Sequence, residues 1–150
     1  MTITLDTPMD LTSRVGEHLG TSSWRRVSQR DVDTFASITG DGQWVHTDVG
    51  RASEGPFGTT IVHAYLTLSL APAILAEVVR IREVGVPLQL GLRDVRFPAP
   101  LPVGARFRTA VVVKRAEQKI VGFEATFSLS YEIEGRNQPA CLAEVIIVYP

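Results

Sequence analysis

The spacing of apolar residues after position 28 is typical of an amphipathic helix. Ser28 is followed three residues later by Asp31, the arrangement of a capping box at a helix N-terminus. Apolar residues then recur at helical intervals at Val32, Phe35 and Ala36. Glycine is disfavoured inside helices, so Gly40 predicts that this helix ends near Thr39. Residues 22–27, just before the helix, are predicted to form a short strand.

A second and more apolar helix is predicted over residues 61–82. Hydrophobic side chains cover nearly every face of this segment until Glu77 and Arg80. A helix that is apolar all round is surrounded by protein, so we expect a buried central helix, with a kink or a missing hydrogen bond at Pro72. Residues 40–60 carry several glycines, a proline and little periodicity, which predicts a long irregular connection. Connections of this length in compact domains are usually functional.

The second half of the chain changes to patterns that are typical of strands. Four segments rich in β-branched and aromatic residues cover residues 88–97, 106–115, 120–132 and 140–149. Turn-forming residues separate them at 98–104, 117–119 and 135–139. Helices followed by a run of strands predict the α+β class. We therefore expect an antiparallel sheet of at least four long strands, wrapped around the buried helix.

Length and composition fit one domain over residues 1–150. The chain is 45% hydrophobic and 21% charged, as is usual for globular domains. A domain of this size can bury a core without disulfides or a structural metal. Residues 1–14 are expected to form a flexible or extended N-terminal segment.

The charge balance and the lack of targeting signals limit the kinds of partner and the cellular location that we expect. Fifteen basic and sixteen acidic residues give a net charge of -1 without charged blocks, which argues against a nucleic-acid partner. The N-terminus lacks a basic region before an apolar stretch, and no apolar run reaches the ~20 residues that a membrane-spanning helix needs. Cys141, the only cysteine, is interpreted as a small buried hydrophobe. We expect a cytoplasmic protein without a membrane partner.

Candidate chemistry lies in residues 40–48, where Asp41 and His46 are five residues apart. A regular helix would turn two such side chains about 140° apart, but a looped segment can bring them to one point. A carboxylate and an imidazole that share one water can take a proton from it and return a proton elsewhere, which is general acid–base catalysis. The structural alternative is that both residues lie in turns, where their side chains make hydrogen bonds to nearby backbone groups.

His63 and the start of the predicted central helix form a second candidate. One interpretation of His63 is that it binds a ligand or acts in catalysis. The interpretation that we favour is structural: His63 lies near a helix N-cap and makes a hydrogen bond to the backbone. The first N–H groups of a helix lack intrahelical acceptors, so they can stabilise an oxyanion without a charged side chain. The three histidines, at positions 18, 46 and 63, show no usual zinc-ligand spacing, so no metal is expected.

Three separated motifs resemble those of one enzyme family. Residues 40–46 read Gly-Asp-Gly-Gln-Trp-Val-His, and Ala52 follows after five more residues, close to the family's hydratase signature. The resemblance continues through residues 55–63 and 67–70 and resumes at 95–104, in the same order along the chain. The chain therefore resembles the MaoC-like dehydratases, the (R)-specific enoyl-CoA hydratases of the hotdog fold. Within this family it looks like the nodulation protein N-like branch.

The resemblance implies a reaction and a set of residue roles. The reaction is reversible addition of water to a trans-2-enoyl thioester, which gives an (R)-3-hydroxyacyl thioester. Asp41 and His46 would hold and activate the water, and the backbone amide of Ala64 would stabilise negative charge on the thioester oxygen. The positions expected to contact substrate are Gln43, Trp44 and Phe97. Phe97 either lines the acyl pocket or is plain core.

Two places depart from the family pattern. Gln43 and Trp44 replace the Asn-Pro of the hydratase signature, as in the nodulation-like branch, and Ala64 replaces the glycine that usually follows the histidine equivalent to His63. Alanine keeps the N–H but adds a methyl group and narrows the allowed backbone conformations. The family further implies an acyl-CoA or acyl-carrier-protein thioester as substrate, no metal or other cofactor, and pairing of two hotdogs into a homodimer.

Three alternatives stay open at this point. A hotdog thioesterase would hydrolyse the same thioesters with differently placed carboxylates. A biosynthetic relative would dehydrate, isomerise or cyclise a carrier-bound intermediate, and the alanine at position 64 keeps this alternative in view. A non-catalytic acyl-binding subunit would have lost its acid–base residues, whereas this chain has both Asp41 and His46.

Overall fold

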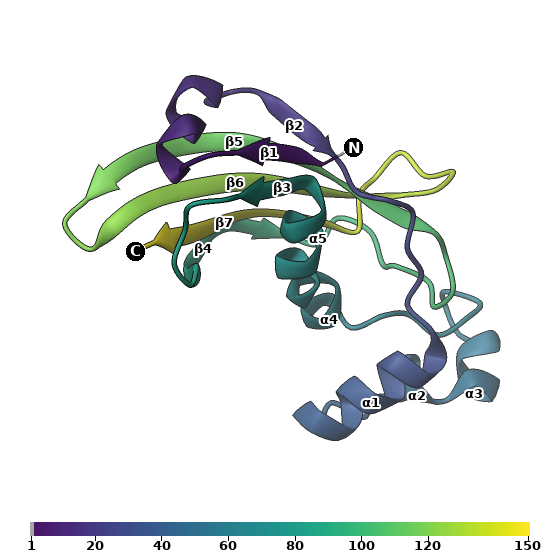
Figure 1. The fold of residues 1–150 in the computed structure, drawn as a ribbon. Helices are drawn as coiled ribbons and strands as arrows, with labels where there is room; N and C mark the ends of the chain where they lie inside the picture. Colours follow the sequence, from purple (N-terminus) through teal and green to yellow (C-terminus); the bar gives the residue numbers. More distant parts are fainter. Residues whose placement is uncertain (1) are drawn as a thin grey trace.

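A five-stranded antiparallel sheet forms the body of the molecule. In this computed structural model, which describes residues 2–150, the strands lie in the order β2, β5, β6, β7 and β4. Their bounds in that order are His18–Thr21, Phe107–Lys119, Gly122–Ile133, Cys141–Tyr149 and Leu88–Arg96. The sheet curves over helices α4 (Ala64–Ser69) and α5 (Ala71–Val78), as Figure 1 shows. This arrangement confirms the predicted α+β hotdog fold.

The core lies between the concave face of the sheet and the central helices. In β6, every second residue from Phe127 to Ile133 is buried, because successive side chains of a strand point to opposite faces. Ile74 and Val78 of α5 are almost completely inaccessible and pack into the same core. Removal of this apolar surface from water is the main force that holds the helices under the sheet.

The central helix is shorter and less continuous than the helix predicted over residues 61–82. It divides at Leu70, and Pro72 lies in the first turn of α5, where its missing N–H needs no acceptor. Val79–Ile81 forms strand β3, which pairs in parallel with β1 (Ile3–Leu5), in place of a last helical turn. This pairing with β1 holds residues 79–81 in extended backbone and so ends the helix early.

One face of the central helices is exposed in this chain, so the expectation that protein surrounds them on all sides is wrong for a single copy. Tyr65 is 75% exposed, and Ala73 and Ala76 are exposed as well. The uncovered strip continues onto the edge strand β4, where Leu90 and Leu92 lie beside α4 and α5.

Residues 2–14 are folded, although residues 1–14 were expected to be flexible or extended; residue 1 lies outside the described residues. Strand β1 is followed by a 3₁₀ helix, η1 (Pro8–Arg14), which contacts β5. Leu5 is 4% exposed and Leu11 is fully buried. The burial of these two leucines in the main core fixes the segment.

Helix α1 (Gln29–Thr39) begins and ends as predicted. The hydroxyl of Ser28 accepts a hydrogen bond from the backbone N–H of Asp31, whose carboxylate accepts one from the backbone N–H of Ser28. Gly40 ends the helix in the left-handed conformation, with φ of 78°, and its N–H donates to the Ala36 carbonyl. This glycine redirects the chain toward the segment that carries the candidate chemistry.

Three local predictions need correction. Residues 22–27 lie outside the strands, apart from a β-bridge between Arg25 and Phe107. The connection over residues 40–60 contains two short helices, α2 (Trp44–Thr47) and α3 (Val49–Ser53), which lie near α1 at the lower right of Figure 1. The turn between β5 and β6 falls at residues 120–121 and not at 117–119, because the pairing of the two strands continues to the end of β5.

Within residues 2–150, every helix is too short or too polar to cross a membrane. The longest, α1, has 11 residues, against the ~20 that a bilayer requires.

Glu77 of α5 ties the central helix to the segment that follows β2, and its removal should lower stability. Its carboxylate accepts a hydrogen bond from the Ser23 N–H and pairs with Arg25, and these contacts lower the pKa of Glu77 below its usual 4.5. The Glu77→Gln variant should lose about 1 kcal/mol of unfolding free energy at pH 7, because the charge-assisted bonds are weakened while the site stays partly exposed. Thermal denaturation measures this loss.

The same contacts predict a pH dependence. Because the pKa of Glu77 is lower in the folded chain, its contribution is complete above pH 4.5 and is lost as the pH falls through the lowered value. The difference in unfolding free energy between wild type and Glu77→Gln should therefore become smaller at acidic pH. Glu117→Gln is the matched control, since within residues 2–150 Glu117 pairs only with Lys119, on the surface, and its replacement should change stability little. An equal loss of unfolding free energy in the two variants would contradict the stabilising role given to Glu77.

Candidate active site

Asp41, His46 and His63 meet at the N-terminal end of α4. Asp41 follows the glycine that ends α1, His46 lies in α2, and His63 is the N-cap residue of α4. Nε2 of each histidine lies 3.9 Å from Oδ2 of Asp41, and the two imidazole rings stack with their centroids 3.9 Å apart. The fold thus gathers one carboxylate and two imidazoles at a single point.

The hydrogen bond that His46 makes to the backbone fixes which ring nitrogen carries the proton. Nδ1 of His46 lies 2.7 Å from the carbonyl oxygen of Ile61, and a carbonyl can only accept. Nδ1 of the neutral ring is therefore the protonated nitrogen, and Nε2 turns its lone pair toward Asp41. A neutral imidazole in this orientation can accept a proton at Nε2.

His63 holds the loop that carries Asp41. Its Nε2 donates to the backbone carbonyl of Asp41 at 2.9 Å, and the residue is only 2% exposed. Among residues 2–150, its buried Nδ1 has no hydrogen-bond partner. The backbone contact agrees with the interpretation that we favoured for His63 in the sequence, but the ring also stands beside Asp41, which sequence separation could not indicate.

Asp41 and His46 face one another across a gap that a small polar molecule can bridge. The 3.9 Å between Oδ2 of Asp41 and Nε2 of His46 is longer than a direct hydrogen bond. A water oxygen within hydrogen-bond distance of both atoms would be held by two acceptors. Such a water would be oriented and polarised toward loss of a proton, which is the chemistry this pair can perform.

These groups open into a cavity of about 420 Å³ between α4 and the segment that follows β4. Of the residues predicted to act on substrate, Asp41, His46, Ala64 and Phe97 line it. Its walls are otherwise largely apolar and include Phe57 and Tyr65. A cavity of this kind accommodates a small apolar group beside the carboxylate and imidazole.

Gln43 and Trp44, which the sequence analysis expects to contact substrate, do not line this cavity. Gln43 is the exposed N-cap residue of α2. The Trp44 ring packs beneath the guanidinium of Arg51, whose central carbon lies 4.4 Å from the ring centroid, and against Gly55.

The backbone N–H of Ala64 is available to a ligand. Ala64 is the first residue of α4, where N–H groups have no intrahelical acceptor, and it lines the cavity. Within the part of the chain that the structure describes, this N–H makes no hydrogen bond. It can therefore donate to an oxygen atom placed beside Asp41 and His46.

Gln29 is a positioning residue that the sequence analysis missed. Its amide NH₂ donates to the backbone carbonyl of His46 at 2.7 Å, and its amide oxygen accepts from the hydroxyl of Thr60 at 2.6 Å. These bonds connect α1 to both ends of the connection that contains His46. In the sequence, Gln29 looks like an ordinary polar residue in the first turn of a helix, so no local pattern reveals this contact.

The same three side chains also form a conceivable metal-ligand set. One ligand atom from each of Asp41, His46 and His63 lies within 4.8 Å of the others. Nε2 of His63 already donates to the carbonyl of Asp41, so this bond would have to break before that nitrogen could bind a cation. The hydrogen-bond pattern therefore favours proton transfer over metal binding at this point.

Sequence comparisons place the chain among related proteins. The model of the MaoC like domain family matches residues 10–132. The chain is 42% identical over 147 residues to the 3-hydroxyacyl-thioester dehydratase Z of Mycobacterium tuberculosis strain H37Rv, and the match covers 97% of each protein. It is 39% identical over 142 residues to nodulation protein N of Rhizobium leguminosarum bv. viciae, covering 93% of this chain and 88% of that protein.

Solved structures share the architecture at lower identity. An (R)-hydratase from A. caviae involved in PHA biosynthesis superposes with a TM-score of 0.72 at 23% identity, over 89% of this chain and 97% of that chain. A monoamine oxidase regulatory protein from Archaeoglobus gives a TM-score of 0.77 at 22% identity, over 99% of this chain and 97% of that chain. At this identity the likeness shows the hotdog fold alone.

Proposed function

Because the chain belongs to the MaoC-like domain family, we propose that it catalyses the reversible hydration of trans-2-enoyl thioesters to (R)-3-hydroxyacyl thioesters. The observation that carries the proposal is the carboxylate of Asp41 facing Nε2 of His46 across a gap inside a largely apolar cavity, while Nδ1 of His46 is held by the Ile61 carbonyl. The relative named as a 3-hydroxyacyl-thioester dehydratase supports the same class of substrate.

In the hydration direction, a water held between Asp41 and His46 attacks the enoyl group. The water oxygen bonds to C3 while Nε2 of His46 takes one of its protons, and the Asp41 carboxylate stabilises the resulting imidazolium. The imidazolium then returns that proton to C2. Hydroxyl and hydrogen have been added across the double bond, and both side chains have recovered their starting states.

The thioester oxygen gains negative charge as the new bond forms at C3. The N–H of Ala64 is placed to donate to that oxygen, and a fixed donor in a cavity with little water stabilises developing charge more than one in bulk water. Phe97 lies on the wall of the same cavity and would contact the acyl group. The substrate is an acyl-CoA or acyl-carrier-protein thioester, and the reaction takes place in the cytoplasm.

An absorbance assay tests this proposal. Hydration of crotonyl-CoA removes the conjugation between the double bond and the thioester, so the ultraviolet absorbance of the enoyl thioester should fall while no free thiol is released. Oxidation of the product by an (R)-specific 3-hydroxyacyl-CoA dehydrogenase, and not by an (S)-specific one, would establish the stereochemistry. Release of thiol would show a thioesterase. Turnover of carrier-bound enoyl groups alone would indicate the biosynthetic alternative.

We also propose that two copies of the chain pair through the edge strand β4. This strand is hydrogen-bonded to β7 on one side only, and three of its leucines are half exposed: Leu88 (57%), Leu90 (55%) and Leu92 (48%). Exposed edge strands readily pair with another chain. A partner strand here would also cover the exposed face of α4 and α5 that adjoins β4.

Light scattering after size-exclusion chromatography should report a dimer, and Leu90→Asp should shift it toward the monomer. A carboxylate placed in an apolar interface loses hydration without gaining a partner, so association should weaken by at least about tenfold. Ile120→Asp is the matched control, because Ile120 is a fully exposed apolar residue at the turn between β5 and β6. A wild-type monomer at micromolar concentration would contradict pairing through β4.

A further inference from the structure

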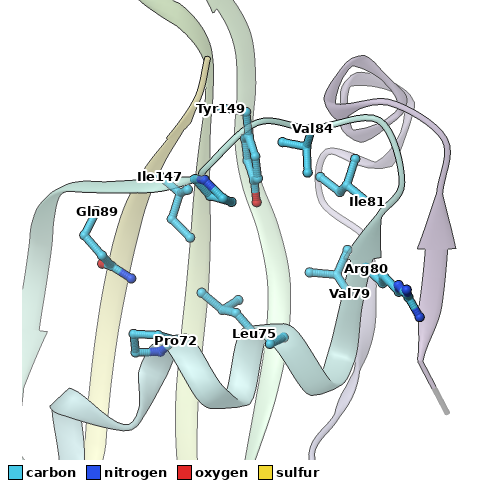
Figure 2. Close-up of a pocket in the computed structure, with 11 residues that line it drawn as sticks. Pro72, Leu75, Val79, Arg80, Ile81, Val84, Gln89, Ile147 and Tyr149 are labelled. Atoms are coloured by element: carbon cyan, nitrogen blue, oxygen red, sulfur yellow. The ribbon is translucent and has the colours of Figure 1, made fainter.

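Acid–base groups are unevenly distributed among the cavities of the molecule. A cavity of about 600 Å³ lies against α5, β3 and the ends of β4 and β7 (Figure 2). Among the described residues, its wall includes no histidine and no carboxylate, and its one charged residue, Arg80, is exposed. The cavity at Asp41, in contrast, is lined by two histidines. The mechanism proposed above uses His46 and gives His63 no part in the reaction.

The ring of His63 lies directly against the ring of His46. Their centroids are 3.9 Å apart and their planes are 25° from parallel, so the face of one ring covers the face of the other. Phe35 of α1 also contacts His63, with the ring centroids 5.0 Å apart. His63 is only 2% exposed, so water has almost no access to its ring. The stack of the two imidazoles is therefore held by packing and is nearly dry.

Two features of its surroundings oppose a second proton on the ring of His63. Nε2 donates to the carbonyl of Asp41, and within residues 2–150 the buried Nδ1 has no hydrogen-bond partner. A proton on Nδ1 would be a buried donor without an acceptor, which costs free energy. It would also place a positive charge beside His46 at the moment when that ring carries the proton taken from water. His63 therefore presents an uncharged aromatic face to His46.

Asp41 alone stabilises a positive charge on His46 only in part. The Asp41 side chain is 40% exposed, and its Oδ2 lies 3.9 Å from Nε2 of His46. Solvent weakens the attraction between two charges at such a position. Aromatic faces also attract cations, and they do so most strongly where water is excluded. The buried face of His63 can therefore supply stabilisation that the partly exposed carboxylate cannot.

We propose that His63 is a positioning residue that acts through its two neighbours. Its Nε2–H fixes the backbone of Asp41, and its uncharged ring stabilises the His46 imidazolium that forms when the bound water loses a proton. In this role His63 exchanges no proton and forms no covalent bond. The inference rests on the proposed function, because the imidazolium is a state of the hydration mechanism.

The His63→Gln variant separates the two contributions. The glutamine amide can donate to the Asp41 carbonyl from about the position of the imidazole Nε2, but it has no aromatic face. For hydration of crotonyl-CoA, kcat should fall roughly tenfold, the effect of losing a cation–π contact in a site with little water. The dissociation constant of butanoyl-CoA, which lacks the double bond, should stay unchanged, since the ring acts on proton transfer and not on the acyl chain.

His18→Gln is the matched control for this substitution. His18 is an exposed histidine of β2, and its ring makes a hydrogen bond to Thr21, far from the cavity at Asp41 in the sequence and absent from its wall. The control should hydrate crotonyl-CoA at the wild-type rate.

Fluorinated rings at position 63 test the attraction itself. His63→Phe keeps a flat aromatic ring and loses the donor, so it serves as the reference for the series. Incorporation of difluoro- and trifluorophenylalanine in its place withdraws electrons from the ring face with little change in shape. The kcat should fall at each step, by roughly tenfold across the series, because a poorer face stabilises the imidazolium less. A ring that only fills space would give the same kcat throughout.

The outcomes separate the role of His63 from the reaction itself. Hydration by His63→Gln at the wild-type rate, or a constant kcat in the fluorinated series, would overturn the role of the ring and leave the hydratase proposal standing. Thermal denaturation shows whether each variant folds, and the fluorinated series decides the question if His63→Gln does not. Failure of wild type to hydrate enoyl thioesters would reject the proposed function and the role of His63 with it.

Discussion

Replacement of Asp41 by asparagine should lower the rate of enoyl-thioester hydration by roughly 10²–10⁴-fold, the usual contribution of a positioned acid–base group. The variant keeps the backbone carbonyl that accepts from Nε2 of His63, so the loop should stay in place. It loses only the negative charge that would stabilise the His46 imidazolium and orient the water. The measurement is the fall in enoyl-thioester absorbance per unit time at saturating substrate.

The split between binding and turnover makes this prediction specific. Asp41→Asn should reduce kcat while the dissociation constant for a saturated acyl-CoA changes little, since the charge acts on the water and not on the acyl chain. Asp48→Asn is the control, because Asp48 is an exposed aspartate nearby that caps α3 through the Arg51 N–H and does not line the cavity. Hydration by Asp41→Asn at the wild-type rate would reject the proposed role of Asp41.

Local patterns predicted those parts of the fold that local forces determine. The capping box at Ser28 and the left-handed Gly40 set the two ends of α1, and both are visible in the sequence because each acts within a few residues. The strands of the second half followed from their β-branched and aromatic residues in the same way. The candidate pair of Asp41 and His46 came from its spacing and its resemblance to a family motif.

Features that depend on distant contacts were not predicted. The end of the central helix at Val78 is set by pairing of β3 with β1, about 75 residues earlier in the chain. The approach of His63 to Asp41 and the bonds from Gln29 to His46 and Thr60 likewise depend on tertiary packing. Each of these residues has an ordinary local setting, so periodicity and composition carry no information about its partner.

The exposed face of the central helices shows a different limit. The apolar pattern of residues 61–82 was interpreted as a helix enclosed by its own chain, whereas Tyr65 and Ala73 are exposed in the single copy. Hydrophobic patterning reports that a surface prefers to be covered but not which molecule covers it. Pairing of two copies through β4 would reconcile the pattern with the structure.

Ala64→Pro should lower kcat by roughly 10²–10³-fold, the usual cost of removing one donor to a developing oxyanion. The substitution removes the N–H and fits the local backbone. Ala64 is the first residue of α4, where proline is favoured, and His63 before it has φ of -55° and ψ of 135°, the conformation that a residue before proline prefers. Thermal denaturation should therefore show a folded protein, and the same absorbance assay gives kcat.

Two comparisons tie the loss in Ala64→Pro to the missing donor. Ala64→Gly keeps the N–H and removes only the methyl group that distinguishes this chain from the family pattern, so its effect on kcat should be far smaller than that of proline. Val49→Pro introduces proline at the first position of α3, outside the cavity, and should leave the rate unchanged. If Ala64→Pro hydrates crotonyl-CoA as fast as wild type, another donor must hold the thioester oxygen. The substrate would then bind beside the acid–base pair in an orientation different from the one proposed above.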